Sequence, residues 1–519
     1  TSNFRAGVNA GNSITSGGNY NTVVGDEAGT AITTGDNNVA VGYAALDLED
    51  TGTDSVAIGY NALTAQNNDA ANYNTAVGSG AGAAVTTGIQ NTLIGGIAGV
   101  ALTTGRENVA VGLAALTTED AGNYNTAIGA RALQTQNAGT DIYNTAVGYA
   151  AGLNVTTGVN NTLIGGLAGD AITTGGYNTA VGYLSGSAIT TGSGNAFFGL
   201  RAGAGTTTGT ANTFIGGSSN SYAGYANTTG ANNTAVGTDA LAANTTASNN
   251  TAVGMDALTA ITTGANNTAV GLNAGDALID ADYNVAVGEG ALGADTYGSN
   301  STAIGRLALA QQNFTSATNS ENTAVGYIAG YSVTTGTNNT LIGMASGDAI
   351  TTGGTNTAVG TFSLSGNTTA GNNTAVGYQA LLANTTGYNN LALGANALDA
   401  NTTANNNVAV GPNSLTANTI GAQNVAVGTA CMSANTTGSD NIAMGVSALD
   451  ANTTGSNNTA LGRQALQANT TASGNVAVGL SALRLNTTGT QNVAVGTTTL
   501  TNCTTGANNT GIGHQSLNA

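Results

Sequence analysis

The side chains that could do acid–base or metal chemistry are few in this sequence. Among 519 residues there is one histidine, His514, and there are two cysteines, Cys431 and Cys503. A lone histidine supplies neither a metal site nor a base with an orienting partner, and no His/Cys cluster has zinc-ligand spacing. The glycines do not form a phosphate-binding loop, because the chain has no lysine. We therefore expect a protein that is not an enzyme, with no catalytic residue, cofactor or metal site.

Carboxylates offer the next possible chemistry, as calcium ligands. A calcium ladder needs acidic residues at matched positions in successive turns of the chain. The recurrent aspartates instead fall in separated copies of a repeat: Asp47, Asp170, Asp276, Asp348, Asp399 and Asp450. We interpret them as solvated surface charge.

A repeat of seventeen residues positions all of these side chains. Thirty glycines mark its copies, from Gly7 to Gly513, and we number positions from this key glycine, position 0. A short fixed period means that each copy is one turn of a stack, too small to bury its own core. We predict one continuous solenoid over residues 1–519, uninterrupted over 326–519. Within 1–325 we expect side insertions near 66–73, 136–143, 217–229 and 312–320.

The residue types within one copy favour β-structure. Asparagine at position −4 precedes a Thr/Val, Ala/Leu, Val/Ile run at −3 to −1, which is a strand signal. Glycines at 0 and +10 suit corners with positive φ, and asparagine amides can bond from one coil to the next. A second short strand is expected at +7 to +9. The fold class predicted is all-β: a parallel β-solenoid (β-roll) of about 30 coils.

Positions +4 and +7 vary together, which indicates a shared interior space. Copies with glycine at +4 carry a large aliphatic residue at +7, as in Gly82 and Val85. Copies with leucine at +4 carry a polar residue at +7, as in Leu381 and Asn384. A close-packed interior has a fixed volume for each coil. Gly203 with Thr206 and Leu258 with Ile261 are exceptions.

Three apolar positions in a row predict a strand that is covered on both faces. One face would line the coil and the other would meet a neighbouring chain, so we expect a homo-oligomer packed along the solenoid axis. The repeat also runs to both ends of the sequence without a cap. We expect either that the sequence is part of a longer chain or that copies stack head to tail, and we adopt the second as the hypothesis.

The charge balance excludes several partners. Net charge is −18 and the seven basic residues are not clustered, so we expect no binding to nucleic acid. No apolar run approaches the roughly 20 residues that span a bilayer, so we expect no membrane insertion. Cys431 and Cys503 lie four repeats apart, which at about 4.8 Å per coil is beyond disulfide reach. We predict free thiols, with Cys431 as buried filler and Cys503 at a corner, where pairing between chains stays open.

The repeat resembles known surface proteins. Asn373-Thr-Ala-Val-Gly377-Tyr-Gln-Ala-Leu381, followed by Asn384-Thr-Thr-Gly387, is similar to the head repeats of YadA-type trimeric autotransporter adhesins. It is more similar to the arrays of phage tail fibres and secreted surface fibre proteins. The resemblance covers essentially the whole chain and implies a left-handed, trimeric β-roll that is extracellular, at a cell surface or on a virion.

Two functions stay open from these observations. The first is a non-enzymatic structural protein that forms an extracellular fibre or filament by lateral and head-to-tail association. The alternative is an adhesin or phage receptor-binding fibre head that recognises surface glycans through the inserted loops and two tyrosine columns. The columns lie at position +1 (Tyr43, Tyr60, Tyr149, Tyr183, Tyr327, Tyr378) and at position −5 (Tyr20, Tyr73, Tyr124, Tyr143, Tyr177, Tyr283). The Asn-Thr-Thr triplets are also N-glycosylation acceptor patterns: Asn384, Asn401, Asn435, Asn452, Asn469 and Asn486.

Overall fold

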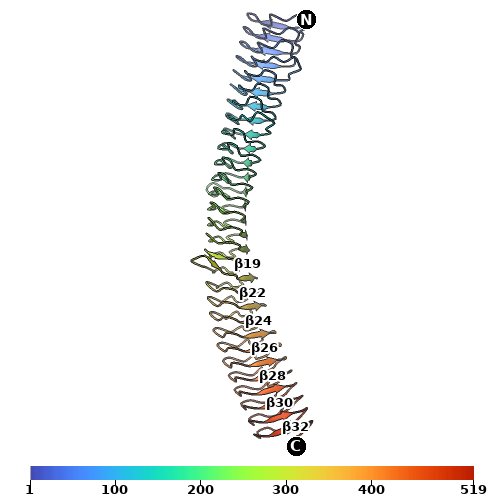
Figure 1. Cartoon of the computed structure of the whole chain (residues 1–519), viewed down its shortest axis with the longest axis vertical. Coiled ribbons are helices and arrows are strands. Elements are labelled where there is room, and N and C mark those ends of the chain that lie inside the picture. Colours follow the sequence, from blue (N-terminus) through green and yellow to red (C-terminus); the bar gives the residue numbers. More distant parts are fainter. Residues whose placement is uncertain (1, 519) are drawn as a thin grey trace. The chain divides into compact units, whose positions relative to one another are not determined.

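A computed structural model describes residues 2–518, which contain no helix and fold as a parallel β-solenoid of about 30 coils. The predicted fold class is therefore confirmed. Two compact units are present: unit 1 ends at Thr263 and unit 2 begins at Gly264. Each coil contributes one three-residue strand at positions −3 to −1, drawn as one arrow per coil in Figure 1. That residues 1–519 behave as a single continuous domain stays a prediction.

The described residues of unit 1 form fifteen strands of the main sheet: β1 (Phe4–Ala6), β2 (Thr22–Val24), β3 (Val39–Val41), β4 (Val56–Ile58), β5 (Thr75–Val77), β6 (Thr92–Ile94), β7 (Val109–Val111), β8 (Thr126–Ile128), β9 (Thr145–Val147), β10 (Thr162–Ile164), β11 (Thr179–Val181), β12 (Ala196–Phe198), β13 (Thr213–Ile215), β14 (Thr234–Val236) and β15 (Thr251–Val253).

The described residues of unit 2 also form fifteen: β16 (Thr268–Val270), β17 (Val285–Val287), β19 (Thr302–Ile304), β21 (Thr323–Val325), β22 (Thr340–Ile342), β23 (Thr357–Val359), β24 (Thr374–Val376), β25 (Leu391–Leu393), β26 (Val408–Val410), β27 (Val425–Val427), β28 (Ile442–Met444), β29 (Thr459–Leu461), β30 (Val476–Val478), β31 (Val493–Val495) and β32 (Thr510–Ile512). A separate short pair joins β18 (Gly298–Ser299) to β20 (Thr318–Asn319).

Strand register places each repeat position on its own counterpart in the next coil. In β5 and β6, for example, Ala76 pairs with Leu93 at position −2. The residue at −2 is buried, whereas those at −3 and −1 point outward and stay partly exposed. Each column therefore stacks on itself, so where successive coils carry the same residue a contact can recur along the unit.

The key glycine is required by both conformation and space. Gly377 has φ 136°, and a Cβ built on it would lie 2.5 Å from the carbonyl oxygen of Gly394 in the next coil. The expectation of positive φ at position 0 is confirmed. The same expectation for position +10 is wrong: Gly387 has no positive φ, and crowding by the Ala404 carbonyl at 2.3 Å favours its small size. Because the backbone at +10 needs no positive φ, alanine nevertheless occupies this position in several copies (Ala247, Ala281, Ala370, Ala404 and Ala472).

Left-handed backbone also occurs at positions −5, +2 and +4, which sequence reasoning missed. Asn372, Gln379 and Leu381 have φ of 59°, 54° and 52°. Asparagine tolerates this region, but leucine does so at a cost of about 1–2 kcal/mol. The burial of leucine at +4 must outweigh that strain.

The second strand predicted at +7 to +9 is wrong. These residues bend, and the amides of Thr436, Thr437 and Gly438 converge on one carbonyl, that of Thr453, at 2.9, 3.1 and 3.4 Å. The Thr436 hydroxyl donates to the same oxygen at 3.0 Å. Parallel strands exchange evenly spaced bonds with separate carbonyls, so this geometry ties coils together without being a strand.

Volume sharing inside the coil is confirmed and involves a third position. A Cβ on Gly82 would lie 2.6 Å from Leu93 Cδ1 and 3.2 Å from Val85 Cγ2. The residue at −2 therefore shares the space with those at +4 and +7. This explains one exception, because a Cβ on Gly203 would lie 2.5–2.7 Å from atoms of the Phe197 ring. Phe197, at position −2, fills the space that Thr206 at +7 leaves open.

A buried asparagine ladder runs through position −4, as predicted. Asn91 donates its backbone N–H to Asn74 Oδ1 at 2.9 Å, and Asn108 donates to Asn91 Oδ1 at 3.0 Å. The Asn91 Nδ2 group also donates to the Gly105 carbonyl at 2.9 Å. Such networks satisfy buried amides that would otherwise be costly, and they hold successive coils in register.

A second buried ladder occupies position +7 in unit 2. Asn384 Nδ2 donates to Asn367 Oδ1 at 2.9 Å and to the Gly387 carbonyl at 2.9 Å, and its Oδ1 accepts from Asn401 at 2.8 Å. The ladder continues through Asn418, Asn435, Asn452 and Asn469 to Asn486. These side chains are fully buried. The acceptor pattern is therefore inaccessible for glycosylation in the folded protein.

Candidate interaction surfaces

The outward side of the main-sheet strands forms a surface that repeats from coil to coil in each unit. We define the outer strand face as positions −3 and −1 of the main-sheet strands. Its −1 residues are all apolar, and several are well exposed: Ile58, Ile94, Ile128, Ile164, Phe198, Ile215, Val270, Ile304, Ile342, Leu393, Met444, Val495 and Ile512. No −3 or −1 residue in the described strands is charged. The expected apolar character of the outer face is confirmed at −1, whereas −3 is threonine in most strands. What covers this face stays a prediction.

Two tyrosine columns project from the coils, and neighbouring rings in them pair. Tyr43 and Tyr60, at +1, stack with centroids 5.5 Å apart and planes 14° apart. Tyr124 and Tyr143, at −5, stack at 4.9 Å and 4°. Arg106 lies over the Tyr124 ring, 6.0 Å from its centroid. Most column tyrosines are about half exposed or more, which leaves aromatic faces available for stacking with a partner.

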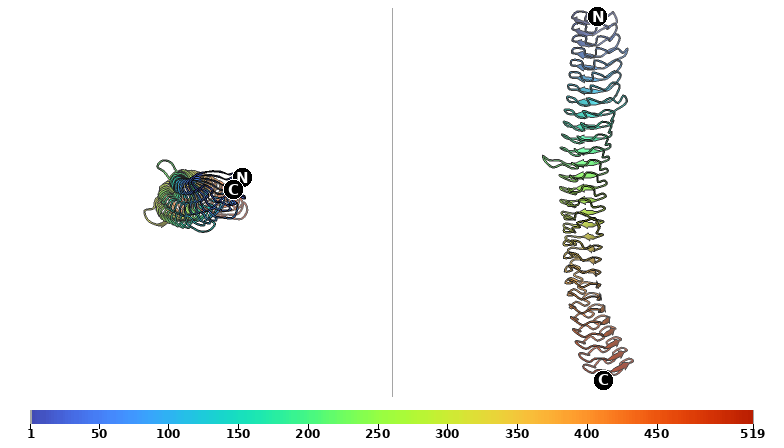
Figure 2. Two further views of the ribbon diagram at one scale, coloured as in Figure 1. Left: turned by 90° about the horizontal axis from the view of Figure 1, so that it is seen from above. Right: turned by 60° about the vertical axis from the view of Figure 1, so that its left-hand side comes forward.

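Three of the inserted segments rejoin the solenoid in the same way. Short parallel pairings connect Thr53 with Ala71, Asn123 with Asp141, and Gly298 with Thr318. The fourth segment differs, since Gly217 and Tyr222 form an antiparallel bridge that closes a turn just after β13. In the right-hand view of Figure 2, the segments near 70 and 140 project to the opposite side of unit 1 from the segment near 220.

A buried carboxylate anchors each of the three similar insertions, which the sequence analysis did not foresee. Glu49, at position +7, is fully buried and accepts hydrogen bonds from the Gly52 amide at 2.8 Å, Gln66 Nε2 at 2.8 Å and Asn72 Nδ2 at 3.0 Å. The amide of Asn68, in the inserted segment, lies 3.4 Å from its Oε1. Burial raises the pKa of the Glu49 carboxyl, while these donors act in the opposite direction.

The other two insertions repeat this arrangement. Glu119 accepts from Gln136 Nε2 at 3.2 Å and from the Ala138 amide at 3.3 Å. In unit 2, Asp295 accepts from Gln312 Nε2 at 2.6 Å and from the Phe314 amide at 3.1 Å. The sequence signal is an acid at +7 followed seventeen residues later by glutamine, directly before an insertion.

The aspartates at position +5 are less solvated than expected. Asp170 and Asp399 are half-buried, and each has one buried carboxylate oxygen without a hydrogen-bond partner. Burial raises the pKa of both carboxyls. Asp348 instead accepts from the Ser365 hydroxyl at 2.5 Å, and Asp450 accepts from Ser433. At +5 the side chain lies against the neighbouring coil, so the interpretation as freely solvated charge is wrong for these copies.

The thiols are both free, as predicted. Cys431 is fully buried, its Sγ donates to the Ala443 carbonyl at 3.2 Å, and burial raises its pKa to about 12. Cys503 stands at +7, where the asparagine ladder would continue. Its thiol does not bond to Asn486 Oδ1, which is left buried without a partner. His514 is exposed.

Within residues 2–518, no three His, Cys, Asp or Glu side chains are grouped so that they could hold a metal ion. Over the same range, no helix of a length and apolarity that would cross a bilayer is present.

Comparison with known proteins adds no assignment. No protein-family model matches this chain, and no curated protein sequence matches it significantly.

Proposed function

We propose that this protein is a non-enzymatic structural protein whose solenoids associate side by side into an extracellular fibre or filament. The observation that carries the proposal is the outer strand face. It is uncharged in every described strand, and it combines threonine and valine at −3 with exposed Val, Ile, Leu, Phe or Met at −1. Long exposed apolar surfaces of this kind are typical of contacts between proteins.

A second copy of the same chain is the partner that fits this face best. The outer strand face presents in each coil one −3 residue, most often threonine, and one apolar −1 residue, at the spacing set by the strands. An identical solenoid has the same spacing, so each coil can meet a coil of its neighbour along the whole contact. A globular partner would match only a few coils. The resemblance to trimeric adhesin heads and tail fibres supports an extracellular homo-oligomer.

Sedimentation velocity tests the proposal with charges placed on the face. Substituting glutamate for Val359, Val376 and Leu393 places three charges at position −1 of successive coils. The proposed interface would bury these charges without a partner, which is costly. The matched control places glutamate at Thr369, Thr386 and Thr403, which are exposed at position +9 of the same three coils. We expect the wild type and the control to associate, and the triple variant on the face to sediment as a monomer. A monomeric wild type would refute the proposal.

Glycan recognition is the second candidate function. The exposed tyrosine columns and the inserted loops favour it, because loops on a rigid scaffold commonly carry binding residues. Binding to whole cells or glycan arrays, lost on removal of the loops, would distinguish it from a purely structural function.

A further inference from the structure

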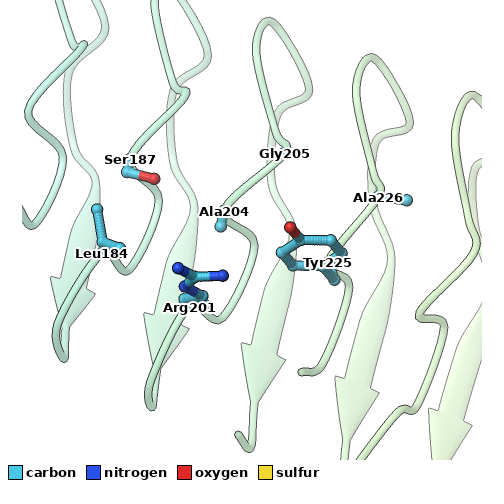
Figure 3. A pocket seen from close by; sticks show the side chains of 7 residues that line it. All are labelled: Leu184, Ser187, Arg201, Ala204, Gly205, Tyr225 and Ala226. Carbon is cyan, nitrogen blue, oxygen red and sulfur yellow. The ribbon is translucent and has the colours of Figure 1, made fainter. Parts of the chain in front are cut away.

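We propose that unit 1 carries a binding site for a carboxylated sugar, centred on Arg201. The groove around this residue has a volume of about 390 Å³ and is lined by Leu184, Ser187, Arg201, Ala204, Gly205, Tyr225 and Ala226. Its volume falls in the range of about 300–1,000 Å³ found for ligand pockets. Figure 3 shows the Arg201 side chain between Leu184 and Ser187 on one side and Tyr225 on the other. The lining comes from three successive coils.

The guanidinium of Arg201 is held in place without being neutralised. Its Cζ lies 5.6 Å from the centroid of the Tyr222 ring, a cation–π contact. Among the residues that the structure describes, no carboxylate forms an ion pair with Arg201, and its guanidinium makes no hydrogen bond. Its planar set of N–H donors is therefore available for a ligand carboxylate, which such a fork binds in bidentate fashion.

The inserted turn supplies the aromatic wall and fixes its position. The Tyr222 amide donates to Asp239 Oδ1 at 2.9 Å, and its hydroxyl donates to the Ser219 carbonyl at 2.9 Å. The Tyr222 and Tyr225 rings contact each other with centroids 5.2 Å apart. Tyr225 stays exposed, so one ring face is free to stack on the apolar C–H face of a sugar. The Ser187 hydroxyl can donate to or accept from sugar hydroxyls.

This combination favours an acidic sugar over a simple anion or a polyanion. One arginine beside an exposed tyrosine suits a single carboxylate attached to a ring. The net charge of −18 disfavours any ligand with dense negative charge. The site is independent of the outer strand face, so its failure would leave the proposed self-association untouched.

The test uses substitutions to residues that other copies of the repeat carry at the same position. Arg201→Gln introduces the residue found at the same position and φ in Gln379 and Gln464. Tyr225→Ala introduces the residue found at Ala242, the corresponding position one coil later. Arg131→Gln is the matched control, since Arg131 also occupies position +2 with φ 62° but lies beside no tyrosine ring in a cation–π contact of the described residues.

Saturation-transfer NMR and calorimetry on the full chain would use tri-galacturonic acid and sialyllactose as probes. The methyl ester of tri-galacturonic acid and lactose are the uncharged sugar controls. Inorganic phosphate is the control for an anion without a sugar. We expect binding of at least one acidic probe, weakened at least about tenfold by Arg201→Gln or Tyr225→Ala and unchanged by Arg131→Gln. The proposal would be overturned if no acidic probe bound or if the esterified or phosphate controls bound equally well. It would also be overturned if Arg131→Gln weakened binding as much as Arg201→Gln.

Discussion

Phe197 and Gly203 should behave as one packing unit, which a double-mutant cycle can measure. Phe197 is fully buried at position −2, stacks on Phe214 with centroids 5.0 Å apart, and occupies the space that a side chain at Gly203 would need. Phe197→Ala should cost about 3–5 kcal/mol, as for other core truncations of this size. Gly203→Leu alone should also destabilise, because its side chain would overlap the Phe197 ring.

The double variant Phe197→Ala, Gly203→Leu should recover about half of the loss. It converts this coil to the common type with alanine at −2, leucine at +4 and a polar residue at +7. Gly203 has φ 60°, close to the 52° of Leu381 at the same repeat position. Recovery is incomplete because leucine strains the left-handed backbone by about 1–2 kcal/mol, and the stacking with Phe214, worth about 0.5–1.5 kcal/mol, is lost.

Hydrogen exchange followed by mass spectrometry is the suitable assay, since coils of a repeat protein can open locally. Amides of β12 and β13 should exchange about 10²–10⁴ times faster in Phe197→Ala and regain part of their protection in the double variant. Gly139→Leu is the control for backbone strain alone, because Gly139 has φ 67° and no atom within 4 Å of a built Cβ. Additive effects of the two substitutions would refute the shared-space argument.

Three further outcomes are expected. Gly377→Ala should destabilise its coil by several kcal/mol, because a Cβ would meet the Gly394 carbonyl at 2.5 Å on a backbone with φ 136°. Gly387→Ala should cost less, because Gly387 has no positive φ and other copies carry alanine at +10; comparable exchange in both variants would contradict this. Cys503→Asn should stabilise the coil by about 1 kcal/mol, because the new amide can donate to the orphaned Asn486 Oδ1; unchanged exchange around Asn486 would count against the ladder. Since burial raises the folded-state pKa of Glu49, its contribution to stability is fullest below the unfolded-state pKa of about 4.5 and falls as pH rises through the folded value. The thermal midpoint should thus carry a component that declines with rising pH and is absent in Glu49→Gln, as melts monitored by circular dichroism would show; identical pH profiles would disprove it.

The repeat period made much of the fold predictable from the sequence. A seventeen-residue step places identical residues one coil apart, so the strand at Thr374–Val376 and the ladder through Asn373 followed from the residue types alone. Local preference misled at Thr436 and Thr437, where a β-branched pair suggested a strand. Their amides instead converge on one carbonyl, a tertiary contact that no local pattern shows.

Features that depend on three-dimensional neighbours were missed. Burial of Glu49 could not be expected, because a glutamate without a cationic partner is almost always at the surface. The groove at Arg201 depends on an inserted turn that brings Tyr222 over the guanidinium. The exception at Gly203 required knowing that Phe197 points into the same space. In each case the missing information was which coil's side chain fills a given volume.

The column at position +7 connects the regular coils with the irregular ones. Where asparagine follows asparagine, each buried amide satisfies the next, and the chain keeps a seventeen-residue step. Where isoleucine or cysteine follows, the last oxygen is orphaned, as in Asn244 before Ile261 and Asn486 before Cys503.

Where an acid at position +7 is followed by glutamine in the next coil, these two side chains form the hydrogen bonds that hold the inserted residues. The Glu49 carboxylate accepts the amide of Gly52 in its own coil and bonds from the next coil, while Gln66 Oε1 accepts from Asn74 at position −4 beyond the insertion. Glutamine is one methylene longer than asparagine. Gln66 Nε2 donates to the hydroxyl of Ser55 at 2.8 Å, and Ser55 occupies position −4, where most coils have asparagine. A buried carboxylate has enough lone pairs to take the amides that an asparagine rung could not satisfy. The solenoid can therefore accommodate a side loop without breaking its register, at coils where an acid at +7 is followed by glutamine at +7 of the next coil.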